Sequence, residues 1–262
     1  FRKLASTADV VLENFRPGAM ARLGLSAESL LKLNPRLVYC AVSGFGQVGP
    51  LSERPSYDQV VQGYCALMAL TGDATTAPVK AGLVVCDTTA AITAAFAIAA
   101  ALVRRNATGQ GEIIDVSMLD AAMGSMTAWI MSNYLNAGHE SQPIGNHSQT
   151  AAPSGTFRAK DGPLNIVCNE QKQWEAACDA MDAAHLKADP RFLGRDDRMR
   201  NHAALVAALE AHLASDTAAV WEEKLIAAGV PAGPVFSPSQ IAHHPQMRER
   251  GQLQTVHVPA LG

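Results

Sequence analysis

Hydrophobic and polar residues follow two alternating patterns over the first half of the chain. Short runs rich in β-branched and apolar residues predict buried strands at residues 10–13, 37–43, 82–86 and 112–116. Elsewhere apolar residues recur every three or four positions, and this helical spacing covers residues 57–70, 90–103 and 118–136. Strands that alternate with helices predict a parallel sheet in a layered α/β domain.

The pattern changes beyond residue 144. Strand patterns at residues 156–159 and 164–168 flank Lys160-Asp161-Gly162 and predict a hairpin. The helical patterns that follow lie at residues 171–180, about 199–213 and 217–228. A connector rich in proline and glycine, 229–238, comes next. We therefore predict a large α/β domain at residues 1–144 and a smaller α+β domain at residues 145–240.

Composition restricts the class of protein. Hydrophobic residues make up 48% of the chain and charged residues 17%, which fits a globular enzyme and excludes a disordered chain. The net charge of −3 gives no general attraction to nucleic acid or to anionic membranes, so we expect neither as a partner. The longest apolar stretch, 90–103, is rich in alanine and too short to span a bilayer, so we predict a buried core helix.

The five cysteines are odd in number and form no C-x-x-C pair, which predicts reduced core residues and favours a cytoplasmic location. The histidines, His243 and His244 included, lack metal-ligand spacing near a carboxylate cluster, so we predict no metal site. The sequence begins without methionine and shows no signal peptide. We expect a fragment or a processed chain.

A loop at residues 44–49 contains the pattern G-x-G-x-x-G. In dinucleotide-binding proteins this pattern opens a helix whose N-terminus meets the pyrophosphate. Here Pro50 and Pro55 follow, which predict a continuing loop. The sequence therefore argues against an NAD or FAD site.

Asp87 lies where the predicted strand 82–86 ends and the alanine-rich helix begins. One interpretation is an N-cap, whose carboxylate accepts hydrogen bonds from the first N–H groups of the helix. The other is a nucleophile at the carboxyl end of a strand, where open α/β sheets bind their ligands. Position alone favours the cap and leaves both open.

Several stretches carry a stronger signal when they are taken in their order and spacing. They are ADVVLENFRPGAMARLGL (8–25), NPRLVYCAVSGFGQVGP (34–50), Ser56-Tyr57-Asp58, GLVVCD (82–87), GQGEIIDVSMLDA (109–121), Gly145-Asn146-His147 and PAGPV (231–235). Together they resemble the class III coenzyme A transferases of the CaiB/BaiF type, which include formyl-CoA and carnitine CoA transferases and, as relatives, α-methylacyl-CoA racemases.

The resemblance implies a fold and an assembly. It implies a Rossmann-like parallel sheet in the large domain, a smaller α+β domain, and a segment at 241–262 that returns toward the large domain. Members of the family are longer at both ends, so we expect the N-terminal part of the large domain and the end of the return segment to be missing. The family also forms interlocked homodimers, which we expect here.

The nucleophilic aspartate of the family corresponds to Asp87. The resemblance implies that its carboxylate attacks an acyl-CoA thioester to give an acyl anhydride and then an aspartyl-CoA thioester, from which the acceptor acid takes the CoA. A dry apolar wall would make the carboxylate more reactive. We expect the N-terminus of the following helix to keep the carboxylate ionised against desolvation.

The same matching places CoA contacts at Asn14, Phe15, Arg16, Arg22 and Tyr57. The two arginines can bind phosphates, and Phe15 can pack on the adenine or the pantetheine arm. The plainer interpretations are a structural salt bridge for Arg16, a solvated helix face for Arg22 and a core position for Tyr57.

Gly145, Asn146 and His147 correspond to the mobile loop that covers the nucleophile in the family, and we predict substrate contacts there. The loop lacks the glycines of formyl-CoA transferases, which argues against oxalate and formate as substrates. His147 could contact an acceptor carboxylate, although a lone loop histidine is usually solvated.

We therefore predict an enzyme that moves CoA from an acyl-CoA to a carboxylic acid, with a dicarboxylate such as succinate as the expected acid. CoA is then a substrate, and no tightly bound cofactor is expected. An α-methylacyl-CoA racemase is the first alternative, but the racemases have histidine where this chain has Tyr57, and tyrosine as a residue type, with an ordinary pKa near 10, is a poor base. A non-catalytic CoA-binding protein is the second alternative.

Overall fold

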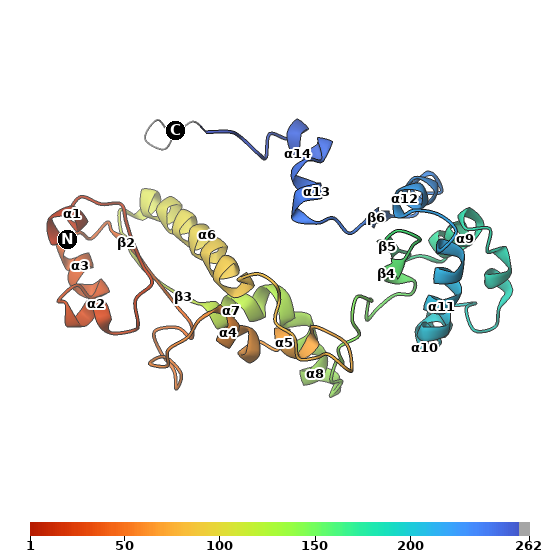
Figure 1. Cartoon of the computed structure of the whole chain (residues 1–262). Coiled ribbons are helices and arrows are strands. Elements are labelled where there is room, and N and C mark those ends of the chain that lie inside the picture. Colours follow the sequence, from red (N-terminus) through yellow and green to blue (C-terminus); the bar gives the residue numbers. More distant parts are fainter. Residues whose placement is uncertain (257–262) are drawn as a thin grey trace. The chain divides into compact units, whose positions relative to one another are not determined.

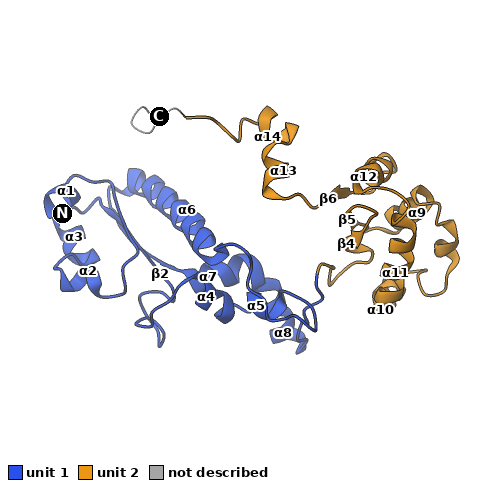
Figure 2. Ribbon diagram, in the orientation of Figure 1, with its two compact units in different colours: residues 1–145 blue, residues 146–262 orange. Residues whose placement is uncertain are grey.

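The structure is a computed structural model that describes residues 1–256. It divides into two compact units, Phe1–Gly145 and Asn146–Gly262 (Figure 2). This division falls one residue from the predicted boundary at 144. The predicted return segment, 241–262, is grouped with the second unit, and its residues 257–262 lie outside the described part.

A three-stranded parallel sheet forms the centre of the first unit, as predicted. The strands are β1 (Val10–Glu13), β2 (Val38–Ser43) and β3 (Glu112–Ser117), in the order β1-β2-β3. Alternate residues of β2 serve two cores. Tyr39 and Ala41 pack with α1 (Arg2–Ala5), α2 (Ala19–Arg22) and α3 (Ala27–Leu33). Cys40 packs with α4 (Asp58–Tyr64), α6 (Val85–Thr108) and α7 (Met118–Ala122). These helices are labelled in Figure 1. The central strand is therefore covered on both faces.

The helical segments of the first unit are α1 (Arg2–Ala5), α2 (Ala19–Arg22), α3 (Ala27–Leu33), α4 (Asp58–Tyr64), α5 (Leu67–Leu70), α6 (Val85–Thr108), α7 (Met118–Ala122), the π-helix η1 (Met123–Thr127) and α8 (Ala128–Ala137). The single helix predicted over 57–70 is divided in two because Ala66 has a φ of 64°, in the left-handed region. The loop at 44–49 opens no helix, in agreement with the argument against a dinucleotide site.

The strand predicted at residues 82–86 is wrong. Val85 and Cys86 already belong to α6, and the side chains of Leu83 and Val84 are 75% and 56% exposed. The run pairs with none of the three strands, although β1 and β3 lie at the edges of the sheet. Strand propensity depends on such partners, and an apolar run without one joins the neighbouring helix.

The helix α6 is not the buried core helix that the sequence predicted. Ala90, Ala94 and Ala101 pack against the sheet, but Phe96 and Val103 on another face are 76% and 72% exposed. The helix has 24 residues, longer than the predicted stretch, and by length and composition it could cross a membrane. In the described residues the bent pair α11 (His202–Leu213) and α12 (Ala218–Ala227) also meets that criterion if it is counted as one broken span. Core helices of water-soluble proteins meet it too.

The second unit contains a three-stranded antiparallel sheet in the order β4-β5-β6. Its elements are β4 (Ser154–Arg158), β5 (Pro163–Val167), α9 (Gln171–Ala180), the 3₁₀ helix η2 (Ala184–Ala188), α10 (Arg195–Arg200), α11 (His202–Leu213), α12 (Ala218–Ala227), β6 (Ala232–Pro234), α13 (Pro238–Ala242) and α14 (Pro245–Glu249). The predicted hairpin is confirmed by β4 and β5. The sequence missed β6, which lies within the predicted connector, because three residues are too few for a recognisable pattern.

All five cysteines are free and buried, as the sequence predicted. Burial raises the pKa of the Cys86 thiol to about 12 and also that of Cys168 to about 12. Such thiols remain protonated and act as small apolar core residues.

Candidate active site

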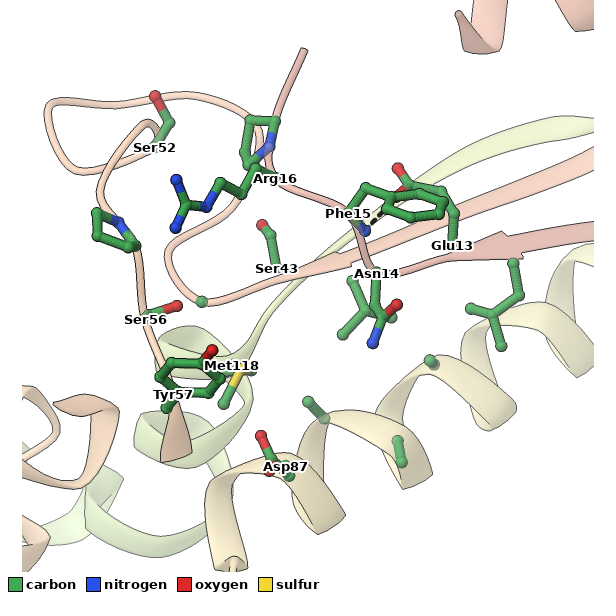
Figure 3. A pocket seen from close by; sticks show the side chains of 18 of the residues that line it. Glu13, Asn14, Phe15, Arg16, Ser43, Ser52, Ser56, Tyr57, Asp87 and Met118 are labelled. Atoms are coloured by element: carbon green, nitrogen blue, oxygen red, sulfur yellow. Dashed lines mark hydrogen bonds between the residues drawn. The ribbon is translucent and has the colours of Figure 1, made fainter. Parts of the chain in front are cut away.

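A cavity of about 930 Å³ lies in the first unit, between the loops that follow β1 and β2 and the first half of α6 (Figure 3). Its lining combines apolar residues of α6 with polar and charged residues of the loops. The lining includes Glu13, Asn14, Phe15, Arg16, Ser43, Gly44, Arg54, Ser56, Tyr57, Asp87, Ala90, Ala94 and Met118. The cavity lies beyond the carboxyl ends of parallel strands, where α/β sheets bind ligands.

Most of the residues predicted for CoA binding line this cavity. Asn14, Phe15 and Arg16 come from the loop after β1, Tyr57 is the residue before α4, and Asp87 lies in the first turn of α6 (Figure 3). Arg22 is exposed at the end of α2 and is not among the lining residues. The tertiary structure thus brings five predicted residues together and leaves Arg22 outside.

The carboxylate of Glu13 accepts two hydrogen bonds that fix the loop carrying Phe15. The backbone N–H of Phe15 donates to Oε2 of Glu13 at 2.7 Å, the dashed line in Figure 3. Oε1 of Glu13 accepts a hydrogen bond from the Tyr39 hydroxyl at 3.1 Å. The aromatic ring of Phe15 itself is 57% exposed and Tyr57 is 83% exposed, so neither is a core residue and both rings are free to contact a ligand.

Asp87 is not the N-cap of α6, because that position belongs to Val84, which has no capping side chain. Asp58 of α4 supplies the cap instead: its Oδ1 accepts from the N–H of Cys86 at 2.7 Å and from that of Asp87 at 3.4 Å. The Asp87 carboxylate is therefore not engaged as the cap of its own helix. The cap interpretation of Asp87 is wrong.

The pKa of Asp87 is raised, first by partial burial and then by the negative charge of Asp58. The sequence predicts that the N-terminus of α6 offsets desolvation, and the raised pKa of Asp87 shows that it does not. The carboxylate of Asp58 accepts from that N-terminus instead, and it also repels the charge of Asp87. A carboxylate with a raised pKa is more basic than a surface carboxylate, and greater basicity favours nucleophilic attack.

Gln62, which is fully buried, connects Asp58 to the chain before α6. Its side-chain NH2 donates to Oδ2 of Asp58 and, at 3.2 Å, to the carbonyl of Leu83. Its Oε1 accepts from the N–H of Ala81 at 2.9 Å. The exposed run before Asp87 is thus held by hydrogen bonds from α4.

The sequence alone did not predict Ser43, Asp58 and Gln62 as residues of the site. Ser43 lines the cavity at the end of β2, and its buried hydroxyl has no hydrogen-bond partner among residues 1–256. Ser43 and Asp58 lie inside stretches that carried the family resemblance, so the signal was present. Their roles depend on contacts between distant segments, which spacing cannot show.

The predicted substrate loop lies at the boundary of the two units. The N–H of Gly145 donates to the carbonyl of Gly72 at 2.7 Å, and the carbonyl of Asn146 accepts from the N–H of Thr156 at 3.1 Å. None of Gly145, Asn146 and His147 is a lining residue of the cavity.

His147 is not a solvated loop residue. Its ring packs edge-on against Phe157, with 5.6 Å between ring centroids, and against His202 at 4.2 Å. Burial, and then the nearby His202, lower the pKa of His147. The imidazole is therefore built into the packing of the second unit.

Residues 1–256 contain no group of three or more His, Cys, Asp or Glu side chains arranged to hold a metal ion. The cavity offers two carboxylates, two basic side chains and four hydroxyls, which belong to Glu13, Asp87, Arg16, Arg54, Ser43, Ser52, Ser56 and Tyr57.

Comparison with known proteins agrees with this arrangement. The model of the family described as CoA-transferase family III matches residues 1–262. The acetyl-CoA:oxalate CoA-transferase of Acetobacter aceti is 40% identical over 254 residues, which are 97% of this chain and 65% of that protein. The succinyl-CoA:glutarate CoA-transferase of Mus musculus is 30% identical over 261 residues, 100% of this chain and 60% of that protein.

The crystal structure of a CAIB/BAIF family protein from Brucella suis superposes with a TM-score of 0.84 at 36% identity, and the match covers 95% of this chain and 66% of that one. The chain spans 60% to 65% of the length of the two curated relatives named above. The family match over the whole chain confirms the resemblance found in the sequence. The chain belongs to CoA-transferase family III.

Proposed function

We propose that this protein transfers coenzyme A from an acyl-CoA to a carboxylic acid through a covalent intermediate on Asp87. The observation that carries the proposal is the position of Asp87, which lies in the cavity with Asn14, Phe15 and Arg16 while Asp58 takes over the capping of its helix. Relatives named as CoA-transferases match nearly the whole chain and support the reaction class.

The reaction proceeds by four exchanges at carbonyl carbons. The Asp87 carboxylate attacks the thioester carbonyl, the carbon–sulfur bond breaks, and an acyl anhydride and CoA thiolate form. The thiolate attacks the aspartyl carbonyl, which releases the donor acid and leaves an aspartyl-CoA thioester. The acceptor carboxylate attacks that thioester, giving a second anhydride, and the thiolate then attacks the acceptor carbonyl and restores Asp87.

The residues around Asp87 have separate tasks in this scheme. Arg16 binds a phosphate of CoA, Phe15 packs against its organic part, and Asn14 hydrogen-bonds to it. Arg22 is a further proposed phosphate ligand, at the outer side of the site. The Tyr57 hydroxyl donates to the reacting carbonyl group, and the alanines of α6 exclude water from the anhydride.

We propose a dicarboxylic acid as the acid partner. The relatives support this class, because their names include oxalate and glutarate as acids and succinyl-CoA as a donor. The relative named as an acetyl-CoA:oxalate CoA-transferase is 40% identical to this chain. The sequence of the loop at 145–147 is therefore not an argument against oxalate. We propose the first unit as the CoA-binding unit and residues 145–147 as contacts of the acid.

Two further features remain proposals. We propose a homodimer, for which the exposed Phe96 and Val103 of α6 provide an apolar surface. We propose a cytoplasmic location, which the five free, buried cysteines support.

Trapping of the intermediate tests the proposed function. The protein is incubated with hydroxylamine and the CoA thioester of a dicarboxylic acid. It is then digested and analysed by mass spectrometry. We expect the Asp87 side chain to be converted to the hydroxamate only when the acyl-CoA is present, and the Asp87→Asn variant to remain unlabelled. A wild-type protein that transfers CoA without labelling at Asp87 would contradict the covalent mechanism.

A further inference from the structure

Asp58 is an unusual capping residue because it belongs to a different helix from the one it caps. It is the first residue of α4, 7% exposed, and its Oδ1 accepts from the first turn of α6. No cation of residues 1–256 forms a salt bridge with it. The charge is therefore balanced by hydrogen-bond donors: backbone N–H groups of α6 and the side-chain amide of Gln62.

Gln62 can hold Asp58 in one orientation only. Its Oε1 is occupied by the N–H of Ala81, and its NH2 group faces the carbonyl of Leu83, so rotating the amide would break both contacts. The NH2 must therefore point at Oδ2 of Asp58, as it does. A buried network that is fully satisfied in this way is rigid and specifies a single arrangement.

The network ends at the nucleophile. Cys86, whose N–H is bound at 2.7 Å, is fully buried and adjoins Asp87, so the turn that carries Asp87 is fixed on one side by core packing and on the other by Asp58. The chain before this turn, which includes the exposed Leu83 and Val84, has little apolar packing of its own. Gln62 replaces that packing with hydrogen bonds.

We propose that Asp58 and Gln62 are positioning residues for Asp87, with Asp58 holding the first turn of α6 and keeping a negative charge beside the nucleophile, and Gln62 locking Asp58 in place. This inference rests on the proposed function, since it assigns the carboxylate of Asp87 the role of nucleophile. Neither residue touches the substrate in this scheme, because neither lines the cavity.

The proposal also explains the electrostatics of Asp87. Glu13, Arg16, Arg54 and Tyr57 share the cavity with it, and Cys86 adjoins it in the chain. Yet after burial the group that raises the pKa of Asp87 is Asp58. The negative charge of Asp58 repels that of Asp87, and this repulsion makes the Asp87 carboxylate more basic. A more basic carboxylate attacks the thioester more readily.

Asp58→Asn tests the charge together with the lock, and Gln62→Leu tests the lock alone. In Asp58→Asn the remaining oxygen can still cap α6, but the negative charge is gone and the new NH2 group faces the NH2 of Gln62. We expect kcat to fall about 10- to 100-fold at pH 7 with KM for acyl-CoA nearly unchanged, since positioning and not binding is lost. We expect the acid limb of the pH profile of kcat to move to lower pH, because the pKa of Asp87 falls without its neighbour.

Gln62→Leu keeps the charge of Asp58 but frees its orientation. We expect a similar loss of kcat with a smaller displacement of the acid limb. Ser117→Ala is the matched control, because the Ser117 hydroxyl is a buried cap of α7 that accepts from the N–H of Asp120 at 3.1 Å. That variant should lower the melting temperature and leave the pH profile in place.

A direct titration of Asp87 separates this proposal from the proposed function. With carbon-13-labelled aspartate, the side-chain carbonyl signal of Asp87, assigned by its loss in Asp87→Asn, reports its pKa without any turnover. A lower pKa of Asp87 in Asp58→Asn than in the wild type supports the proposal even if no CoA transfer is found. An unchanged pKa, or variants that lose only thermal stability, would overturn it.

Discussion

Gly44 and Ser56 lie so close that a Cβ atom on Gly44 would be 1.7 Å from Oγ of Ser56 and 2.5 Å from its Cβ. Both residues line the cavity, and Ser56 directly precedes Tyr57. The absence of a side chain at Gly44 therefore lets the loop before α4 approach the end of β2. This contact helps to place Tyr57 over the same cavity as Asp87.

A methyl group at this contact should displace the loop. We expect Gly44→Ala to lower kcat/KM about 10- to 100-fold, because displacements near 1 Å at a reacting centre have effects of that size. The free energy of unfolding should fall by about 1–3 kcal/mol, as for other overpacked sites. Steady-state kinetics and urea denaturation measure both quantities.

The double variant Gly44→Ala/Ser56→Gly removes the two atoms that the methyl group would meet, so we expect it to recover most of the loss relative to Ser56→Gly alone. Gly162→Ala is the control, since a Cβ there has no neighbour within 4 Å. Full activity in Gly44→Ala alone would show that the close approach of Gly44 and Ser56 does not affect catalysis.

Because the pKa of Asp87 is raised, its ionised side chain lowers the free energy of unfolding at neutral pH. Since its pKa is higher in the folded than in the unfolded chain, the folded state is favoured when the carboxyl is protonated, and this contribution is lost as pH rises through the folded-state pKa. We expect Asp87→Asn to lower the rate of CoA transfer by about 1,000-fold or more. Its free energy of unfolding at pH 7 should be equal to or slightly above that of the wild type.

The stability difference has a defined pH dependence. It should shrink as pH falls through the raised pKa and vanish below about 3.9, the usual value for aspartate in an unfolded chain. Urea denaturation of both proteins across this range measures it. A variant that is less stable than the wild type at pH 7 would mean that Asp87 has a structural role.

Tyr57 separates transfer from racemisation. A racemase needs two acid–base groups on opposite faces of the α-carbon, and tyrosine is a poor general base at pH 7. We expect no deuterium from solvent at the α-carbon of a 2-methylacyl-CoA during a time in which CoA transfer is complete. Nuclear magnetic resonance of the recovered thioester measures this. Rapid incorporation would favour the racemase alternative.

The second unit depends on a buried cation, Arg198, which is 2% exposed. Its guanidinium lies 5.1 Å from the centre of the Trp174 ring and donates to the carbonyls of Ala152 at 2.6 Å and Phe192 at 3.0 Å. These carbonyls lie in different segments of the unit, so one side chain satisfies acceptors that would otherwise be buried without partners.

We expect Arg198→Met to reduce the free energy of unfolding by about 2–6 kcal/mol, since it leaves two buried carbonyls without partners at about 1–3 kcal/mol each. Arg198→Lys should recover little, because lysine lacks the planar fork that reaches several acceptors. Arg195→Ala, an exposed position, is the control. Urea denaturation followed by tryptophan fluorescence measures the change, and a loss below about 1 kcal/mol would contradict the assignment.

The exposed face of α6 tests the proposed dimer. Phe96 is 76% exposed and Val103 is 72% exposed, which is unusual for large apolar side chains on one helix. We expect Phe96→Glu to shift the protein from dimer to monomer in light scattering, because a charge cannot be buried there without a partner. Phe1→Glu, at an exposed residue in the first position of the chain, is the control. A wild-type protein that is monomeric at all concentrations would contradict the proposal.

Local patterns in the sequence determined the regular elements that have strong periodicity. The parallel strands β1, β2 and β3, the hairpin of β4 and β5, and the helix α9 follow from apolar spacing and strand propensity within each segment. The family could also be identified, because its motifs preserve their order and spacing along the chain. These features depend on the residue types within one segment or on the order of motifs along the chain, and the sequence contains both.

The tertiary structure decided the parts that depend on partners distant in the sequence. The run 82–86 looked like a strand, but it pairs with none of β1, β2 and β3, and Val85 and Cys86 belong to α6. Asp87 looked like a cap, but Asp58, 29 residues earlier, takes that role at the N–H of Cys86 and Asp87. A hydrogen bond between distant residues leaves no periodic trace in a sequence, because its geometry arises only when the helices pack.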